Sequence, residues 1–300
     1  MKNILFAASE CVPFIKTGGL ADVVGALPKS LNHNEYDVRV VIPNYTCIPW
    51  EYRSQFRYVS HFYMDYGRHV ENVHVGIMEY VYEGVHFYFI DNEYYFKCDR
   101  PYSDSTQWDI ERFIFFSKAV LAAMPVIGFH PDIIHCHDWQ TGMIPVFLKS
   151  IATHSFYWGT KSIMTIQPEI SRAYGTFVTL STYQPASYMF TPDKLEFRAM
   201  PTCSRAVWSA RTTSRPSAKP CRRNQDPYYG EQLDGLPHAP VRSAVSLNGI
   251  DYEVTIPRPT KDRCTLFRQG CCGKAGKAGS QKELGLPEDE NKFMSRLFPV

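Results

Sequence analysis

The first 45 residues predict a strand, a helix and a second strand in immediate succession. Residues 3–8, "NILFAA", form a short continuous apolar run, which is typical of a strand buried on both faces of a parallel sheet. Beyond Gly18 the apolar residues recur at helical spacing, and residues 37–45, "DVRVVIPNY", supply the second strand. Such a strand–helix–strand unit places its two strands parallel, so the chain is constrained to an α/β sheet.

The pattern continues to about residue 166. In residues 74–92, two runs with a two-residue side-chain period flank a polar residue followed by glycine, Glu83 and Gly84, and this pattern predicts a hairpin. A further unit follows, with a strand at residues 132–137, a helix from Trp139 to about Lys149 capped by Asp138, and a strand at residues 162–166. We therefore expect a Rossmann-like, doubly wound α/β sheet through residue 166.

Composition excludes several classes of protein. A formal net charge of +2 on 300 residues offers no general attraction for nucleic acid or an acidic membrane surface. Nine cysteines show no CxxC spacing, so neither a zinc site nor a disulfide framework is predicted, and reduced thiols in the cytoplasm are expected. The apolar run at the start is too short for a signal peptide, and no stretch is long enough to span a membrane.

The stretch "IKTGGLADVVGAL" places Lys16, Gly18 and Gly19 directly before the first predicted helix. The N–H groups at a helix N-terminus attract anions, and glycines allow a phosphate to approach the main chain. Lys16 would add a full positive charge. The alternative is a solvated lysine beside a glycine turn, and the pattern alone leaves both interpretations open.

A second group of polar residues lies in "PDIIHCHDWQTG", residues 131–142. His135 and His137 are two apart on a strand and therefore project to one face. With Asp138 they could hold a metal, although no further ligand is evident. An exposed Asp138 carboxylate beside the Trp139 indole suits a sugar better, because the ring stacks on a pyranose while the carboxylate accepts hydroxyl hydrogen bonds. Alternatively, Asp138 is a helix cap and Trp139 a core residue, and these two roles are compatible with sugar binding.

Several segments together resemble the amino-terminal lobe of the ADP-glucose-dependent bacterial glycogen synthases and plant starch synthases. They are "KNILFAASECVPFIKTGGLADVVGALPKSL", "FIDNEYYF", "ERFIFFSKAVL" and "PDIIHCHDWQTG". The resemblance implies a GT-B glycosyltransferase that transfers glucose from ADP-glucose to the nonreducing end of an α-1,4-glucan with retention, without a metal or other cofactor. It assigns Lys16, Gly18 and Gly19 to ADP-glucose and Tyr95, Asp138, Trp139 and Asn248 to the glucan.

Residues 167–300 keep the resemblance only in patches, such as "FTPDKLEF" and "NGIDYE". Residues 198–225 contain six Arg and no acidic residue, and no helix or strand period is visible there. A basic, nucleic-acid-binding segment is one interpretation. The other interpretation is that the coding DNA contains frameshifts. A set of codons for "PEISRAYG", when preceded by the bases AA and translated from two bases earlier, encodes Asn-Leu-Lys-Phe-Gln-Gly-His-Met. This peptide is close to the family sequence at that place. We favour frameshifts with later returns to frame, and DNA sequencing tests this.

Three departures from the family bear on activity. Gln167 stands where the resemblance implies a cleft histidine, the carboxy-terminal lobe is absent, and Ser295, Arg296 and Leu297 begin a diphosphate-clamping motif without its lysine. We therefore expect no glucose transfer by the chain as it stands. The alternatives are a noncatalytic glucan-binding module, with an aromatic face of Tyr94, Tyr95 and Trp139, and a GT-B enzyme for another sugar nucleotide.

Overall fold

The computed structural model describes residues 1–31, 33–66, 71–151 and 155–166, together with the backbone of three short strands farther along the chain. These are β8 (Glu196–Phe197), β9 (Met200–Pro201) and β10 (Thr213–Pro216), of which β8 and β9 pair only with each other. All described residues belong to the first of two compact units, Met1–Gly249 and Ile250–Val300. No helix within these described residues is long and apolar enough to cross a membrane.

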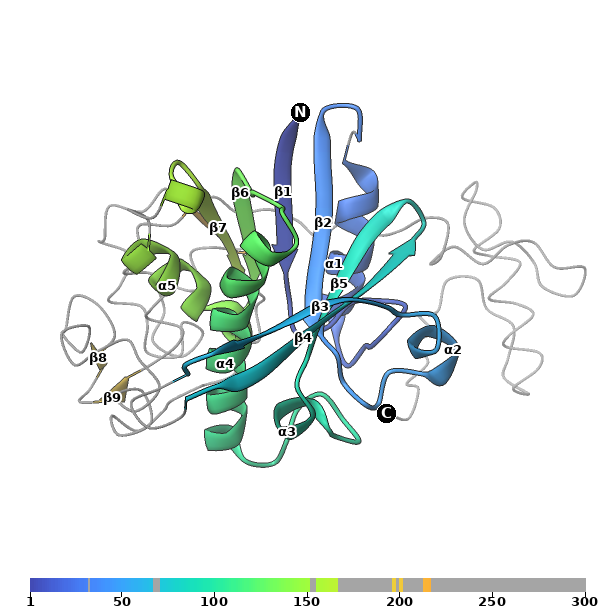
Figure 1. Ribbon diagram of the computed structural model, residues 1–300, viewed down its shortest axis with the longest axis vertical. Coiled ribbons are helices and arrows are strands. Elements are labelled where there is room, and N and C mark those ends of the chain that lie inside the picture. Colours follow the sequence, from blue (N-terminus) through green and yellow to red (C-terminus); the bar gives the residue numbers. More distant parts are fainter. Residues whose placement is uncertain are drawn as a thin grey trace, which may run out of the picture. The chain divides into compact units, whose positions relative to one another are not determined.

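An eight-stranded mixed sheet organises the first unit, in the order β10-β7-β6-β1-β2-β5-β4-β3 (Figure 1). Its parallel part contains β1 (Lys2–Ala7), β2 (Tyr36–Pro43), β5 (Val85–Asp91), β6 (Ile133–His137) and β7 (Lys161–Ile166). α1 (Gly19–Ser30) connects β1 to β2, as predicted. The α/β sheet expected from the sequence is confirmed.

The antiparallel edge of the sheet is formed by β3 (Arg57–Met64) and β4 (Val73–Tyr82). β4 joins β5 through the predicted hairpin turn. Glu83 and Gly84 both have positive φ, 47° and 79°. This left-handed pair matches the right-handed twist of the flanking strands, which is why a polar residue followed by glycine marks the turn.

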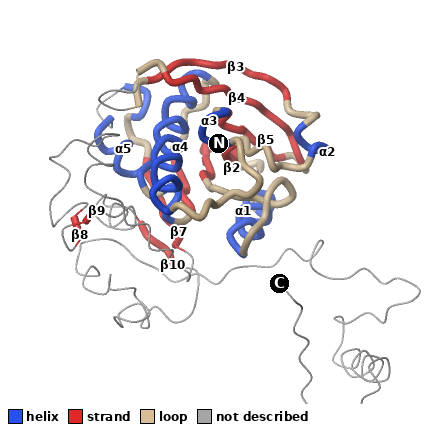
Figure 2. Tube along the Cα trace, turned by 90° about the horizontal axis from the view of Figure 1, so that it is seen from below, coloured by secondary structure: helices blue, strands red, loops and turns tan. Residues whose placement is uncertain are grey.

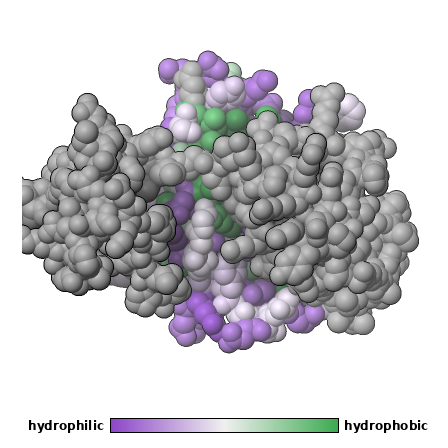
Figure 3. All heavy atoms as spheres, turned by 180° about the vertical axis from the view of Figure 1, so that it is seen from behind, coloured by the Kyte–Doolittle hydropathy of each residue, from purple (hydrophilic) through white to green (hydrophobic). Residues whose placement is uncertain are grey.

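Helices cover both faces of the sheet (Figure 2). α4 (Thr106–Val126) and α5 (Met143–Ile151) lie on one face, and α1 lies on the other. Four shorter helical turns complete the described chain: α2 (Trp50–Arg53), α3 (Glu93–Phe96) and two 3-10 turns, at Trp139–Thr141 and Ser155–Tyr157. Seen from behind, the described residues that remain visible are mostly hydrophilic at the upper and lower ends, and some hydrophobic residues show between them (Figure 3).

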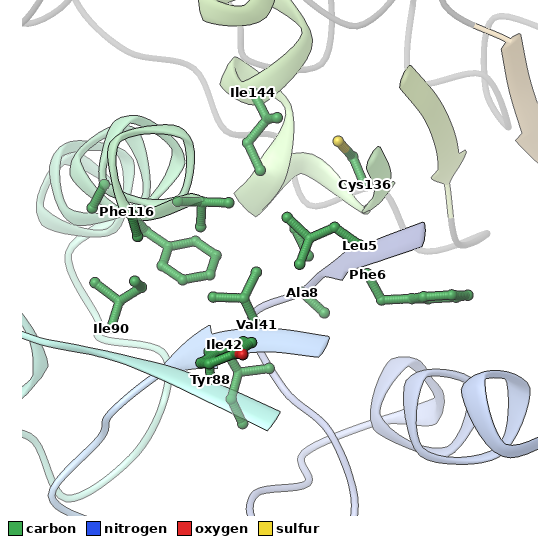
Figure 4. Packing of buried hydrophobic residues seen from close by; sticks show 14 of the residues in the cluster. Leu5, Phe6, Ala8, Val41, Ile42, Tyr88, Ile90, Phe116, Cys136 and Ile144 are labelled. Atoms are coloured by element: carbon green, nitrogen blue, oxygen red, sulfur yellow. The ribbon is translucent and has the colours of Figure 1, made fainter. Parts of the chain in front are cut away.

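One part of the core lies between the sheet and the α4–α5 layer, and the same buried cluster also includes Leu20 and Val24 of α1. Leu5 and Val41 project from neighbouring strands toward Phe116 of α4 and Ile144 of α5 (Figure 4). All four side chains are at most 1% exposed. β1 is buried on both faces, which explains its continuous apolar sequence.

Two expectations are corrected by the structure. The predicted helix from Trp139 begins as a 3-10 turn, Trp139–Thr141, and α5 starts only at Met143. The segment 198–225, for which no strand was expected, contributes β10, which pairs in parallel with β7. A sheet edge offers unpaired N–H and C=O groups to any extended backbone, so tertiary pairing can form a strand that no side-chain pattern announces. The predicted division of the chain into a well-patterned part, residues 1–166, and a degraded remainder, residues 167–300, stays a prediction.

Candidate functional site

The candidate site lies where the strand order reverses. β1 pairs with β2 on one side and β6 on the other, and the chain leaves the carboxyl ends of β1 and β6 in opposite directions. In open α/β sheets this crevice is where ligands bind. Two segments meet there: residues 8–18, which follow β1, and residues 138–142, which follow β6.

Phe14 anchors the loop after β1. It is 1% exposed, and its ring lies 4.9–6.1 Å from six aromatic rings, mostly edge-on. These rings belong to Tyr52, Phe56, Tyr80, Tyr82, Phe87 and Phe89. Cys11 and Ile15 form a short antiparallel bridge across the same loop. Lys16 therefore extends from a loop whose base is fixed in the core.

Glu10 stabilises the end of this loop by hydrogen bonds with Thr17. Its buried carboxylate accepts hydrogen bonds from Thr17 N at 2.5 Å and Thr17 Oγ1 at 2.8 Å. It also accepts one from Tyr102 Oη at 3.2 Å, and Tyr102 Oη is 2.8 Å from Ser9 Oγ. Glu10 thus joins the start of α1 to the segment before α4. Sequence reasoning did not identify Glu10, although an ionisable residue directly after a buried strand is a signal that could have found it.

Lys16, Gly18 and Gly19 lie together at the N-terminus of α1, as predicted. Lys16 Nζ is 2.7 Å from Asp22 Oδ1, and both side chains are more than half exposed. Gly18 is the N-cap residue, and no side chain caps it. A Cβ added at Gly18 or Gly19 would have no described atom within 4 Å. The helix N-terminus is therefore open to an incoming anion.

Asp138 has an unusual backbone at the end of β6, with φ 60° and ψ −179°. This region is almost reserved for glycine and costs about 1–3 kcal/mol. Hydrogen bonds from Asp138 N to Thr165 O (2.8 Å) and from Trp139 N to Asp138 Oδ1 (2.8 Å) hold the conformation, so the predicted cap exists. Burial and, to a smaller extent, the nearby Glu10 outweigh the opposing hydrogen bond from Trp139 N and raise the pKa of Asp138 to about 7.

His135 and His137 lie on one face of β6, as predicted, with ring centroids 4.1 Å apart. His135 Nε2 is 2.8 Å from Thr165 Oγ1. His137 is fully buried, and neither of its ring nitrogens has a hydrogen-bond partner among the described residues. Burial, followed by repulsion from His135, holds the pKa of His137 well below its usual range. The searched part of the chain contains no cluster of three or more potential metal ligands.

The expectation of an exposed carboxylate beside a stacking tryptophan is wrong. Asp138 and Trp139 are each 7% exposed, and Trp139 packs edge-on against Phe113 of α4 at 5.4 Å. Trp139 Nε1 is buried without a partner in the described chain. Tyr95 is 3% exposed and stacks on Phe115 at 4.4 Å. A sugar could reach these groups only at their edges.

The proposed aromatic face does not form either. Tyr94 is 69% exposed, whereas Tyr95 and Trp139 lie in the core, so the three do not present a common surface. Gln167 and Asn248 lie outside the described residues, as do Ser295, Arg296 and Leu297. Their roles remain predictions.

Comparisons with known proteins identify the family to which the chain is similar. The sequence profile of the starch synthase catalytic domain matches residues 3–238. A glycogen synthase from Lachnospira eligens is 48% identical over 308 residues, covering 99% of this chain and 63% of that protein. A glycogen synthase from Lachnoclostridium phytofermentans is 44% identical over 304 residues, covering 98% of this chain and 62% of that protein. The chain thus spans less than two thirds of these relatives.

A solved structure supports the fold. The catalytic domain of starch synthase IV from Arabidopsis thaliana, bound to ADP and acarbose, superimposes with a TM-score of 0.79 at 21% identity. The match covers 94% of this chain and 58% of that chain. At this identity the likeness concerns the fold alone, and it confirms the expected GT-B-type α/β architecture.

Proposed function

The chain belongs to the family of starch synthase catalytic domains, and from this premise we propose that it provides the amino-terminal lobe of an ADP-glucose-dependent glycogen synthase. In this proposal the intact enzyme is a retaining hexosyltransferase that adds glucose to the nonreducing end of an α-1,4-glucan in the cytoplasm. It uses no cofactor and binds neither nucleic acid nor membrane.

One observation carries the proposal for ADP-glucose. The N-terminus of α1, with Lys16, Gly18 and Gly19, has no side-chain cap and lies where the strand order reverses. The loop before it is held by the buried Phe14 and by the hydrogen bond from Thr17 N to Glu10. The partial positive charge of free N–H groups and the charge of Lys16 suit a diphosphate. The pair between Lys16 and Asp22 is exposed and therefore weak, so a diphosphate can displace Asp22 from the ammonium group.

We further propose that the glucan lies beyond the carboxyl end of β6. Asp138 holds its carboxylate there through a strained backbone, and such strain is characteristic of functional sites. Because Tyr95 and Trp139 are almost completely buried, we assign to them the support of this edge rather than a stacking platform. Asn248 is assigned to the glucan by family resemblance.

A glucose-transfer assay tests the proposal. We expect no transfer by the chain as it stands, and transfer to glycogen after the reading frame is restored, Gln167→His is introduced and the second lobe is supplied. In that enzyme Lys16→Ala should lower the initial rate roughly tenfold to a hundredfold, since a charge-assisted contact is worth about 1.5–3 kcal/mol.

Lys29→Ala is the matched control, because Lys29 lies in the last turn of the same helix and pairs with Glu83 at 2.6 Å. It should change the rate little. Equal, small losses at both positions would contradict the role of Lys16 in binding the diphosphate. Retention of the present chain on insoluble glycogen without any transfer after restoration would instead favour a glucan-binding module.

A further inference from the structure

Two half-buried cysteines face each other beside the candidate site. Cys47 lies in the segment after β2, and Cys98 follows α3. Their Sγ atoms are 4.0 Å apart, although 51 residues separate them in the sequence. Both thiols are free in the structure.

The backbones around the two cysteines are already fastened together. Thr46 N donates to Phe96 O at 3.0 Å, Cys98 N donates to Thr46 Oγ1 at 2.8 Å, and Thr46 Oγ1 donates to Cys98 O at 3.0 Å. A disulfide has an S–S distance of about 2.05 Å, so the sulfur atoms must approach by roughly 2 Å. Side-chain rotation can supply most of that movement, since the main chains are held adjacent.

The two thiols are chemically unequal. The hydrogen bond with Cys47 lowers the pKa of Cys98, and the Arg112 guanidinium lowers it further, against the opposing effect of burial. The same hydrogen bond and burial raise the pKa of Cys47. The thiolate is the nucleophile in disulfide exchange, so Cys98 should react first and Cys47 second.

We propose that Cys47 and Cys98 form a reversible disulfide when the chain meets a low-molecular-weight disulfide oxidant. The Cys98 thiolate attacks one sulfur of the oxidant, forms a mixed disulfide and expels the first small thiol. Cys47, losing its proton to solvent, then attacks Cys98 Sγ and expels the second. The two cysteines are thereby oxidised, and one disulfide oxidant is reduced to two thiols.

This disulfide would lie close to the loop after β1, residues 8–18, to which we assign ADP-glucose. Tyr102, which donates a hydrogen bond to Glu10, lies four residues after Cys98 in the sequence. Arg112 pairs with Asp109 and donates a hydrogen bond to the carbonyl oxygen of Pro101, which lies between Cys98 and Tyr102 in the sequence. A disulfide at Cys98 would tie the beginning of this segment to the segment after β2. The pair is therefore a modification site placed to sense oxidation next to the crevice.

Peptide mapping of the full chain tests the proposal. The folded chain is incubated with oxidised glutathione, remaining thiols are alkylated, and the protein is digested with trypsin. Cys47 and Cys98 then lie on residues 40–53 and 98–112, because trypsin does not cleave between Arg100 and Pro101. We expect these peptides linked to each other, and separated again by dithiothreitol.

Two variants distinguish the order of reaction. In Cys47→Ser the resolving thiol is absent, so Cys98 should accumulate as the mixed disulfide with glutathione. In Cys98→Ser the attacking thiol is absent, so Cys47 should be recovered mainly as alkylated thiol. The buried Cys11 and Cys136, whose pKa values are raised by burial, serve as internal controls and should not react in the folded chain.

Three results would overturn the proposal. The first is the absence of the linked peptide while Cys47 and Cys98 are modified separately in the wild-type chain. The second is the same pattern of products in both variants. The third is an equal yield of the linked peptide in concentrated urea, because the bond would then owe nothing to the fold.

Discussion

Replacing Asp138 by asparagine should stabilise the chain at high pH and have little effect at low pH. The pKa of Asp138 rises from 3.8 to about 7 because the carboxylate is buried and faces Glu10. A folded-state pKa above the unfolded value means that the folded chain retains a proton that the unfolded chain releases. The contribution of Asp138 to stability is therefore lost between about pH 4 and pH 7.

The size of this effect follows from the pKa values. Each pH unit between them corresponds to about 1.4 kcal/mol, so the full interval corresponds to roughly 4 kcal/mol at pH 8. Asparagine keeps an oxygen to accept the hydrogen bond from Trp139 N and is itself enriched at positive φ, so cap and backbone strain are retained. The difference in unfolding free energy between Asp138→Asn and wild type should therefore grow by about 3–4 kcal/mol from pH 4 to pH 8.

Urea unfolding of both proteins at the two pH values, followed by Trp fluorescence, measures this difference. Asp109→Asn is the control, because Asp109 is also buried but pairs with Arg112 at 2.6 Å. Breaking that pair leaves a buried charge and should destabilise by about 3–5 kcal/mol at pH 8. A difference for Asp138→Asn that stays constant within about 1 kcal/mol between pH 4 and pH 8 would refute the burial argument.

Three further variants test how the loop of Lys16 is supported. A Cβ at Gly25 would overlap the Val12 side chain and lie 2.9 Å from the Val12 carbonyl oxygen, so Gly25→Ala should destabilise by about 1–3 kcal/mol in urea unfolding. Gly19→Ala meets open space and should be neutral or slightly stabilising; equal effects would contradict the steric argument. Phe14→Ala should cost about 3–5 kcal/mol and expose the amides of the Lys16 loop to hydrogen exchange, whereas unchanged exchange would show that the aromatic cluster does not anchor it.

Local patterns in the sequence were sufficient for most of the sheet. The apolar run of β1, the helical spacing of α1 and the hairpin turn at Glu83 and Gly84 are dictated by periodicity and backbone sterics within a few residues. The positions of Lys16, Gly18 and Gly19 at a helix N-terminus after the first strand followed from the same rules. The family resemblance then supplied their proposed ligand, which no local rule could identify.

What only the tertiary structure decided depends on contacts distant in the sequence. Whether Trp139 faces solvent was settled by α4, whose Phe113 packs against it after β6, and the exposed site that we expected was wrong because Asp138 and Trp139 are both buried. The bonds from Glu10 to Thr17 and Tyr102, and the approach of Cys47 to Cys98, join segments that only the folded sheet brings together. β10 likewise forms because β7 offers an edge, since backbone pairing is indifferent to side-chain pattern. Sequence therefore determines which local elements are available, and long-range packing determines which of their side chains meet.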